Sequence, residues 1–135
     1  MKKAAMAVLA FVIVFLAYVA FQSPHYVISR SLAISAPAEK IFPYLNNSRL
    51  AGEWGPWKEV DPGTAMNLSG PEEGVGARTS WSGGKQLGTG SATIVESVAN
   101  QRVGIKLEYT APTTMTQDAI YLIEPAGAPS PVTWK

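Results

Sequence analysis

Residues 26–45, which read YVISRSLAISAPAEKIFPYL, decide how this chain folds. The first half, residues 26–35, alternates apolar and polar side chains well enough for a β-strand. Pro37 then favours the first turn of a helix, and Glu39 suits the positive N-terminal end of that helix. The stretch therefore predicts a strand that is followed directly by a short helix.

The predicted helix has one apolar face, formed by Ile41, Phe42 and Leu45. After a short break, residues 49–54 can form a second short helix, which Gly55-Pro56-Trp57 ends. We therefore expect two short helices between the first and the second strand.

The rest of the sequence predicts an antiparallel meander of short strands. Gly83-Gly84 is a signal for a two-residue hairpin, and Gly88 and Gly90 predict a bulge or bend in a long strand. A loop is expected over residues 126–131. The predicted strands are residues 65–69, 76–82, 86–98, 102–110, 116–124 and 132–135. The clearest is 102–110, where Val103, Ile105 and Leu107 point inward.

The N-terminal segment does not share this pattern of short strands and one-sided apolar helices. From Ala4 to Phe21 it contains no charged or strongly polar residue, and as a helix these 18 residues extend about 27 Å, close to the thickness of the bilayer core. We expect a transmembrane anchor over residues 1–23 and a separate domain over residues 24–135. Lys2 and Lys3 predict a cytoplasmic N-terminus, with the domain on the outer, periplasmic or extracellular side of the membrane. A cleaved signal peptide and a buried soluble helix are the alternatives.

Charge and composition exclude several functions. Removing Lys2 and Lys3 from the 11 basic residues leaves 9 against 10 acidic ones, a net charge of −1, so nucleic acid is not an expected partner. The sequence has no cysteine, which excludes disulfides and thiol catalysis. No cluster has metal-ligand spacing, and the single histidine, His25, stands next to the apolar segment. We therefore assign no catalytic residue, metal or cofactor.

Several local motifs, in their order, resemble the START-like (SRPBCC) superfamily, and within it the polyketide cyclase/dehydrase-like branch. Together they extend over about residues 26–135. The motifs are RSLAISAPAEKIFPYL at residues 30–45, WGPW at 54–57 with Asp61-Pro62, SGPEEGVGA at 69–77 before Trp81, and VTW at 132–134.

The resemblance implies an α+β fold of the helix-grip type. In that fold a curved antiparallel sheet wraps around a long C-terminal helix, with a cavity between them. No C-terminal helix is found in this sequence, which ends inside the expected last strand. The resemblance therefore implies a C-terminally truncated START-like domain, either a fragment or the product of a shortened gene.

The site residues are predicted from the cavity that the resemblance implies. Ligand cavities are mostly apolar with a few polar groups, so the candidates for the lining are the aromatic residues Trp54, Trp57, Trp81, Tyr109 and Tyr121. Arg30 and Arg78, which lie within strands, are the candidates for contact with a polar ligand group. Packing of the aromatic rings in the core and exposure of the two arginines are the alternative interpretations.

These observations predict a membrane-anchored START-like domain that binds an apolar small molecule or a lipid. The alternatives are an enzyme of the cyclase/dehydrase kind and a module that docks a protein or the membrane surface. Acid–base chemistry needs a titratable group inside the pocket, and the sequence offers no convincing one, which favours binding over catalysis.

Overall fold

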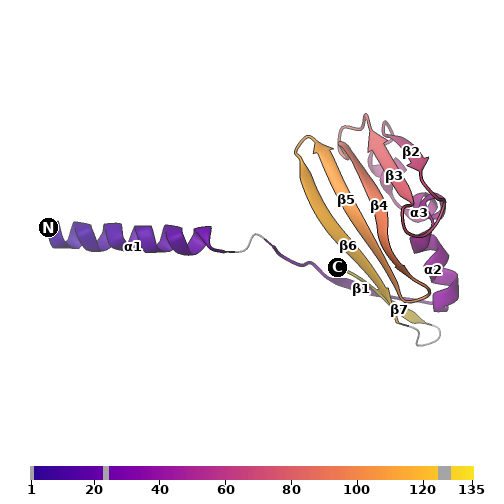
Figure 1. Cartoon of the computed structure of the whole chain (residues 1–135), viewed down its shortest axis with the longest axis horizontal. Coiled ribbons are helices and arrows are strands. Elements are labelled where there is room, and N and C mark those ends of the chain that lie inside the picture. Colours follow the sequence, from indigo (N-terminus) through magenta and orange to yellow (C-terminus); the bar gives the residue numbers. More distant parts are fainter. Residues whose placement is uncertain (1, 23–24, 125–128) are drawn as a thin grey trace.

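The computed structural model describes residues 2–22, 25–124 and 129–135, and it describes the side chains of the first helix from Met6 onward. In the part of the chain that the structure describes, all helices precede β2, and the strands from β2 to β7 follow one another (Figure 1). The helices are α1 (Lys2–Ala20), α2 (Ala38–Asn46), α3 (Ser48–Trp54) and α4 (Trp57–Val60). The strands are β1 (Arg30–Ile34), β2 (Ala65–Ser69), β3 (Arg78–Ser82), β4 (Thr89–Val98), β5 (Arg102–Ala111), β6 (Met115–Ile123) and β7 (Ser130–Trp134).

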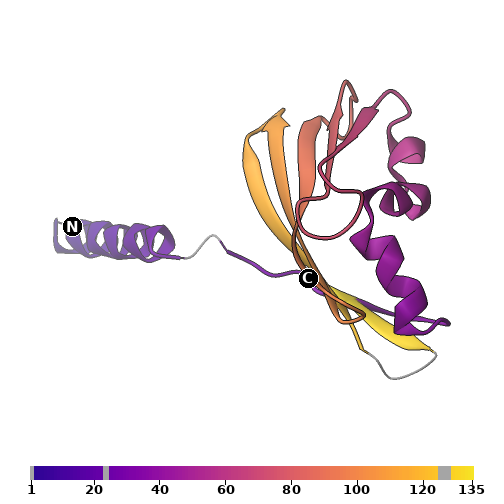
Figure 2. The ribbon, with the colours of Figure 1, turned by 45° about the vertical axis from the view of Figure 1, so that its right-hand side comes forward.

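The strands form one antiparallel sheet in the order β1-β7-β6-β5-β4-β3-β2. The predicted meander is confirmed, since each strand from β2 to β7 pairs with the next one along the chain. The pairing of β1 with β7, for example Leu32 opposite Val132, joins the two ends of the domain. The sheet is curved, and α2 and α3 lie on its concave side (Figure 2).

The core lies where α2 contacts the sheet. Ala38, Ile41 and Leu45 recur at helical spacing, so they lie on one face of α2 and are buried. The second buried set is Ile94, Val103 and Ile123 of the sheet, together with Ala77, which directly precedes β3. The inward direction predicted for the apolar residues of β5 is confirmed at Val103, which is fully buried.

The bulge predicted near Gly88 and Gly90 is confirmed, because the register of β4 on β5 shifts between Thr89 and Gly90. Gly88 has a φ of +65°, which favours glycine. A Cβ atom at Gly90 would lie 2.6 Å from the carbonyl oxygen of Glu108 and 2.8 Å from the Trp81 ring. Glycine at position 90 therefore allows the Trp81 ring to lie against the strand.

Three details of the prediction are wrong. A third short helix, α4, follows α3, because the chain turns again directly after Pro56 instead of remaining extended. Gly83-Gly84 does not form a two-residue hairpin, since residues 83–88 separate β3 from β4 and the Asp61 carboxylate holds the backbone at Gln86. β1 is shorter than predicted and begins only at Arg30, where pairing with β7 begins.

The apolar N-terminal segment is helical, as predicted, and α1 lies clear of the sheet in Figures 1 and 2. Every described side chain from Met6 to Phe21 is exposed. Among the described residues, no helix is long and apolar enough to cross a membrane. The predicted boundary between residues 23 and 24 lies outside the described residues, as do residues 126–128 of the loop predicted over 126–131. Of the described part of that loop, Ser130 and Pro131 belong to β7.

Candidate functional site

A groove of about 570 Å³ lies between α2 and the β1–β7–β6 end of the sheet. Its floor follows from the register of the strands. Arg30 of β1 is opposite Trp134 of β7, and Trp134 is opposite Tyr121 of β6, so the three side chains form a row across the sheet. Leu32 and Val132 form a second row beside it. The floor is therefore apolar and aromatic, with one cation at the edge strand.

The opposite wall comes from the helices. Lys40 and Tyr44 are four residues apart on α2, so they project from the same face one turn apart. Trp54 of α3 completes this wall, and its indole Nε1 donates a hydrogen bond to the backbone carbonyl of Tyr44 (2.9 Å). That hydrogen bond fixes the Trp54 ring against the end of α2 while leaving 51% of the residue exposed. The wall thus presents two aromatic rings and one cation.

The charged residues that line the groove are Arg30 and Lys40, and both are basic. The ring of Tyr121 lies deeper, and burial raises the pKa of its hydroxyl above the usual value of 10.0, so the phenol stays neutral. The described lining contains no carboxylate and no imidazole. Chemically, the groove can hold an apolar molecule and offer positive charge to its polar end.

The predicted site residues do not all come together in this groove. Arg30, Trp54 and Tyr121 line it. Trp81 and Tyr109 instead form an edge-to-face pair with ring centroids 5.6 Å apart, on the β3–β4–β5 part of the sheet, where Gly90 of β4 lies between them. The indole Nε1 of Trp81 donates to the carbonyl of Leu87 (3.2 Å).

The other two predicted residues lie outside the groove. Trp57 of α4 is 45% exposed, and its ring covers Gly55 so closely that no Cβ would fit there. Arg78 is three residues from Trp81 on β3, so it projects from the opposite face of the sheet. There its Nη1 lies 3.7 Å from Glu108 Oε2 and 3.4 Å from Thr93 Oγ1.

The groove residues that were not predicted as site residues from the sequence include Lys40, Tyr44 and Trp134. The i, i+4 spacing of Lys40 and Tyr44 is a signal that could have identified them as one helix face. Trp134 had no such signal, because its neighbours are set by the pairing of β7 with both β1 and β6. Within the described parts of the chain, no group of three acidic, histidine or cysteine residues could hold a metal ion.

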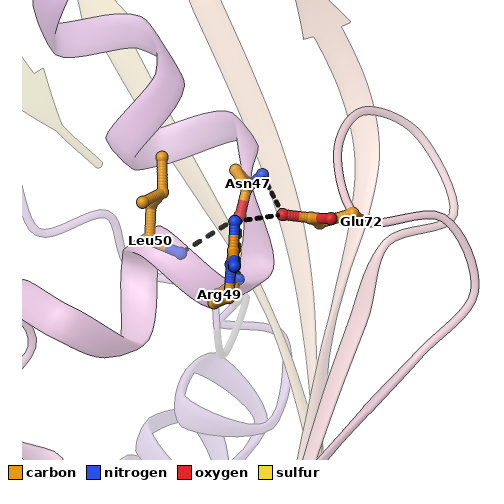
Figure 3. A network of polar contacts seen from close by, with 4 residues as sticks. All are labelled: Asn47, Arg49, Leu50 and Glu72. Carbon is orange, nitrogen blue, oxygen red and sulfur yellow. Dashed lines mark hydrogen bonds and ion pairs between the residues drawn. The ribbon is translucent and has the colours of Figure 1, made fainter.

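A polar network fixes the helix that carries Trp54. Asn47 caps α3, since its Oδ1 accepts hydrogen bonds from the backbone N–H groups of Arg49 (3.0 Å) and Leu50 (3.1 Å). Glu72 joins the network through Asn47 Nδ2 (3.3 Å) and Arg49 Nη2 (2.8 Å), as Figure 3 shows. The turn between β2 and β3 is thereby linked to the junction of α2 and α3.

A second polar anchor lies next to α4. Asp61 is only 6% exposed, and its Oδ2 accepts hydrogen bonds from the backbone N–H groups of Gln86 (2.7 Å) and Leu87 (2.9 Å). These backbone hydrogen bonds, first that of Leu87, hold the pKa of the Asp61 carboxyl below 3.8. Because the same Leu87 accepts from Trp81, the anchor and the Trp81–Tyr109 pair form one unit.

Comparison with known proteins shows similarity only at the level of structure. No model of a known protein family matches the chain, and a search of curated proteins also found no match. Among solved structures, a protein from Thermobifida fusca is 18% identical with a TM-score of 0.60, and the match covers 79% of this chain and 69% of that one.

Two further solved structures agree with this result. The Aha1 dimer from Colwellia psychrerythraea is 18% identical with a TM-score of 0.56, covering 79% of this chain and 72% of that one. Protein CV1439 from Chromobacterium violaceum is 14% identical with a TM-score of 0.57, covering 80% and 77%. At these identities the likeness shows the fold alone. The curved seven-stranded antiparallel sheet with α2 and α3 is consistent with the helix-grip fold, although no helix follows β7 among the described residues.

Proposed function

We propose that this chain is a membrane-attached domain that binds an apolar small molecule or a lipid in the groove between α2 and the β1–β7–β6 strands. The observation that carries the proposal is the groove itself, a space of about 570 Å³ lined almost entirely by apolar and aromatic side chains. Ligand sites are typically concave, apolar and provided with a few polar groups. The lack of a carboxylate or imidazole among its described lining residues favours binding over acid–base catalysis.

The two tryptophans beside the groove provide a matched test. Trp54 lines the groove and Trp57 does not, although both belong to short helices and are about equally exposed, at 51% and 45%. The full chain is placed in phosphatidylcholine nanodiscs and exposed to a diazirine-bearing fatty acid, with empty discs as the blank. After irradiation, we expect the cross-linked peptides to include the α2 and β7 segments.

We expect Trp54→Ala to weaken binding of this probe about tenfold, because an aromatic wall of the site is removed. Trp57→Ala should leave binding unchanged. If the probe labels the domain evenly, or if both variants bind it as the unaltered chain does, the ligand-binding function must be given up. The exposed concave face would then favour the module that docks a protein.

The membrane part of the proposal rests on the sequence. The run from Ala4 to Phe21 is apolar on every face, and the described side chains from Met6 onward are exposed on α1. An exposed helix of this kind is more stable in lipid than in water. We further propose that Lys2 and Lys3 keep the N-terminus cytoplasmic and place the domain on the outer side.

Flotation with phosphatidylcholine vesicles tests the attachment. The unaltered chain should float with the vesicles. The double variant Leu9→Lys, Val14→Lys should remain in the aqueous fraction, because each lysine near the middle of an inserted helix costs roughly 2.5–3.5 kcal/mol. The double variant Lys58→Gln, Lys85→Gln, which alters the domain alone, should float normally. Flotation of the Leu9→Lys, Val14→Lys chain would contradict attachment through α1.

A further inference from the structure

We infer that the groove selects an amphiphile whose polar end is negatively charged, and that Arg30 and Lys40 hold that end. The inference rests on the proposed binding of an apolar ligand and adds the charge of that ligand. It follows from the charges that line the groove, from their lack of partners and from their positions next to aromatic rings.

Arg30 differs from the other arginines of the chain. Arg49, Arg78 and Arg102 each pair with a glutamate, at 2.8, 3.7 and 2.8 Å respectively. Over residues 25–124 and 129–135, Arg30 lies within ion-pair distance of no carboxylate, and the same holds for Lys40. The two basic residues of the groove are therefore available for an acidic ligand group.

Apart from the tyrosine hydroxyls, the remaining polar side chain of the lining, Ser31, already has a partner. The Ser31 hydroxyl shares a hydrogen bond with the Thr133 hydroxyl (2.8 Å). A ligand that enters the groove thus meets apolar surface, aromatic rings and two basic residues. A negatively charged head group complements this lining, whereas a cationic one is repelled by it.

The two cations come from opposite walls of the groove. Arg30 belongs to the sheet and lies opposite Trp134 in register, while Lys40 belongs to α2, one turn before Tyr44. Each cation therefore stands beside an aromatic ring of its own wall. An acyl chain can lie along the rings while its head group reaches the cations. The planar guanidinium of Arg30 suits the two oxygens of a carboxylate or phosphate.

The experiment compares probes that differ only in charge. The full chain in phosphatidylcholine nanodiscs is titrated with a fluorescent fatty acid and with its methyl ester, and with lysophosphatidic acid and the matching monoacylglycerol as competitors. Empty discs correct for the probe that enters the bilayer. Because the two cations are exposed, we expect the acid to bind about fivefold tighter than its ester. We also expect that preference to shrink as sodium chloride is added.

The double variant Arg30→Gln, Lys40→Gln should lose this preference and still bind the ester. The double variant Arg78→Gln, Lys106→Gln is the matched control. It removes the same two charge types from the opposite face of the sheet and should keep the preference. The affinity gain of each acid over its neutral counterpart identifies the head group. A larger gain for the fatty acid over its ester indicates a carboxylate, and a larger gain for lysophosphatidic acid over the monoacylglycerol indicates a phosphate.

Two results would overturn the inference while leaving the proposed function intact. The first is equal binding of acid and ester by the unaltered chain, and the second is an acid preference that survives in the Arg30→Gln, Lys40→Gln chain. Binding of no probe at all, charged or neutral, would instead remove the proposed function on which the inference rests.

Discussion

The groove and the opposite end of the domain use the same residue types in different ways. In the groove, Trp54, Tyr121 and Trp134 surround open space, and Arg30 has no ion-pair partner among the described residues. At the other end, which we call the closed end, the polar and aromatic groups bind one another. The closed end consists of Asn47, Arg49, Asp61, Glu72, Leu87, Trp81 and Tyr109.

This difference shows that an aromatic or charged residue is a candidate for ligand contact only when its ring or its charge has no partner within the protein. Trp81 has a ring partner and a hydrogen-bond acceptor, so its interactions are already made within the chain. Trp54 uses its N–H group but presents its ring to the groove. Substitutions in the closed end should therefore change stability, whereas substitutions in the groove should change binding.

The largest expected effect in the closed end is that of Trp81→Ala. It removes the edge-to-face contact with Tyr109 and the hydrogen bond to Leu87. We expect the free energy of unfolding to fall by about 2–3 kcal/mol, below the about 3–5 kcal/mol of a fully buried tryptophan because Trp81 is partly exposed. Urea denaturation of the full chain in nanodiscs measures this change.

The distinction between the groove and the closed end is tested by measuring probe binding to the same Trp81→Ala protein, under conditions where it remains folded. We expect the affinity for the fluorescent fatty acid to be unchanged. A stability close to that of the unaltered chain together with weakened binding would place Trp81 in the ligand site and would remove the distinction between the two regions.

A smaller effect is expected for Asn47→Ala. This substitution removes the cap of α3, which accepts two backbone hydrogen bonds, and the contact with Glu72 (Figure 3). The loss should be about 1–2 kcal/mol of unfolding free energy. Asn67→Ala, at an exposed position of β2, is the control and should cost far less. Similar losses for both variants would show that the cap does not stabilise the junction of α2 and α3.

The smallest change in unfolding free energy at neutral pH is expected for Asp61→Asn. The amide oxygen of asparagine can still accept the hydrogen bonds from the backbone N–H groups of Gln86 and Leu87. The pKa of Asp61 lies below 3.8 in the folded chain, so the folded state binds fewer protons than the unfolded one at mildly acidic pH. Asp61 therefore contributes stability above about pH 4, and this contribution disappears as the pH falls through the folded pKa.

The urea midpoint of the unaltered chain should accordingly decrease more steeply between pH 5 and pH 3 than that of Asp61→Asn. This pH range is chosen because an aspartate carboxyl group in an unfolded chain has a pKa of about 3.9. Glu124→Gln is a control, since this carboxylate is exposed. Parallel pH profiles for the unaltered chain and Asp61→Asn would contradict the anchoring role of this carboxylate.

The sequence by itself determined the order of the strands and of the helices α1, α2 and α3, whereas α4 was not predicted. The alternation in residues 102–110 predicted β5, and the spacing of Ile41 and Leu45 predicted the buried face of α2. The glycines at 88 and 90 predicted the register shift in β4. These features are local, because hydrophobic periodicity and glycine conformation act over a few residues.

Tertiary structure alone decided which residues form the groove. Arg30 and Trp134 are far apart in the sequence, and only the pairing of β1 with β7 makes them neighbours. The same holds for the loop at residues 83–88, whose shape depends on hydrogen bonds to Asp61 more than twenty positions earlier. Nothing local distinguished Trp54 from Trp57 or Arg30 from Arg78. The environment of each of these side chains is set by long-range pairing and packing, which neither spacing nor composition encodes.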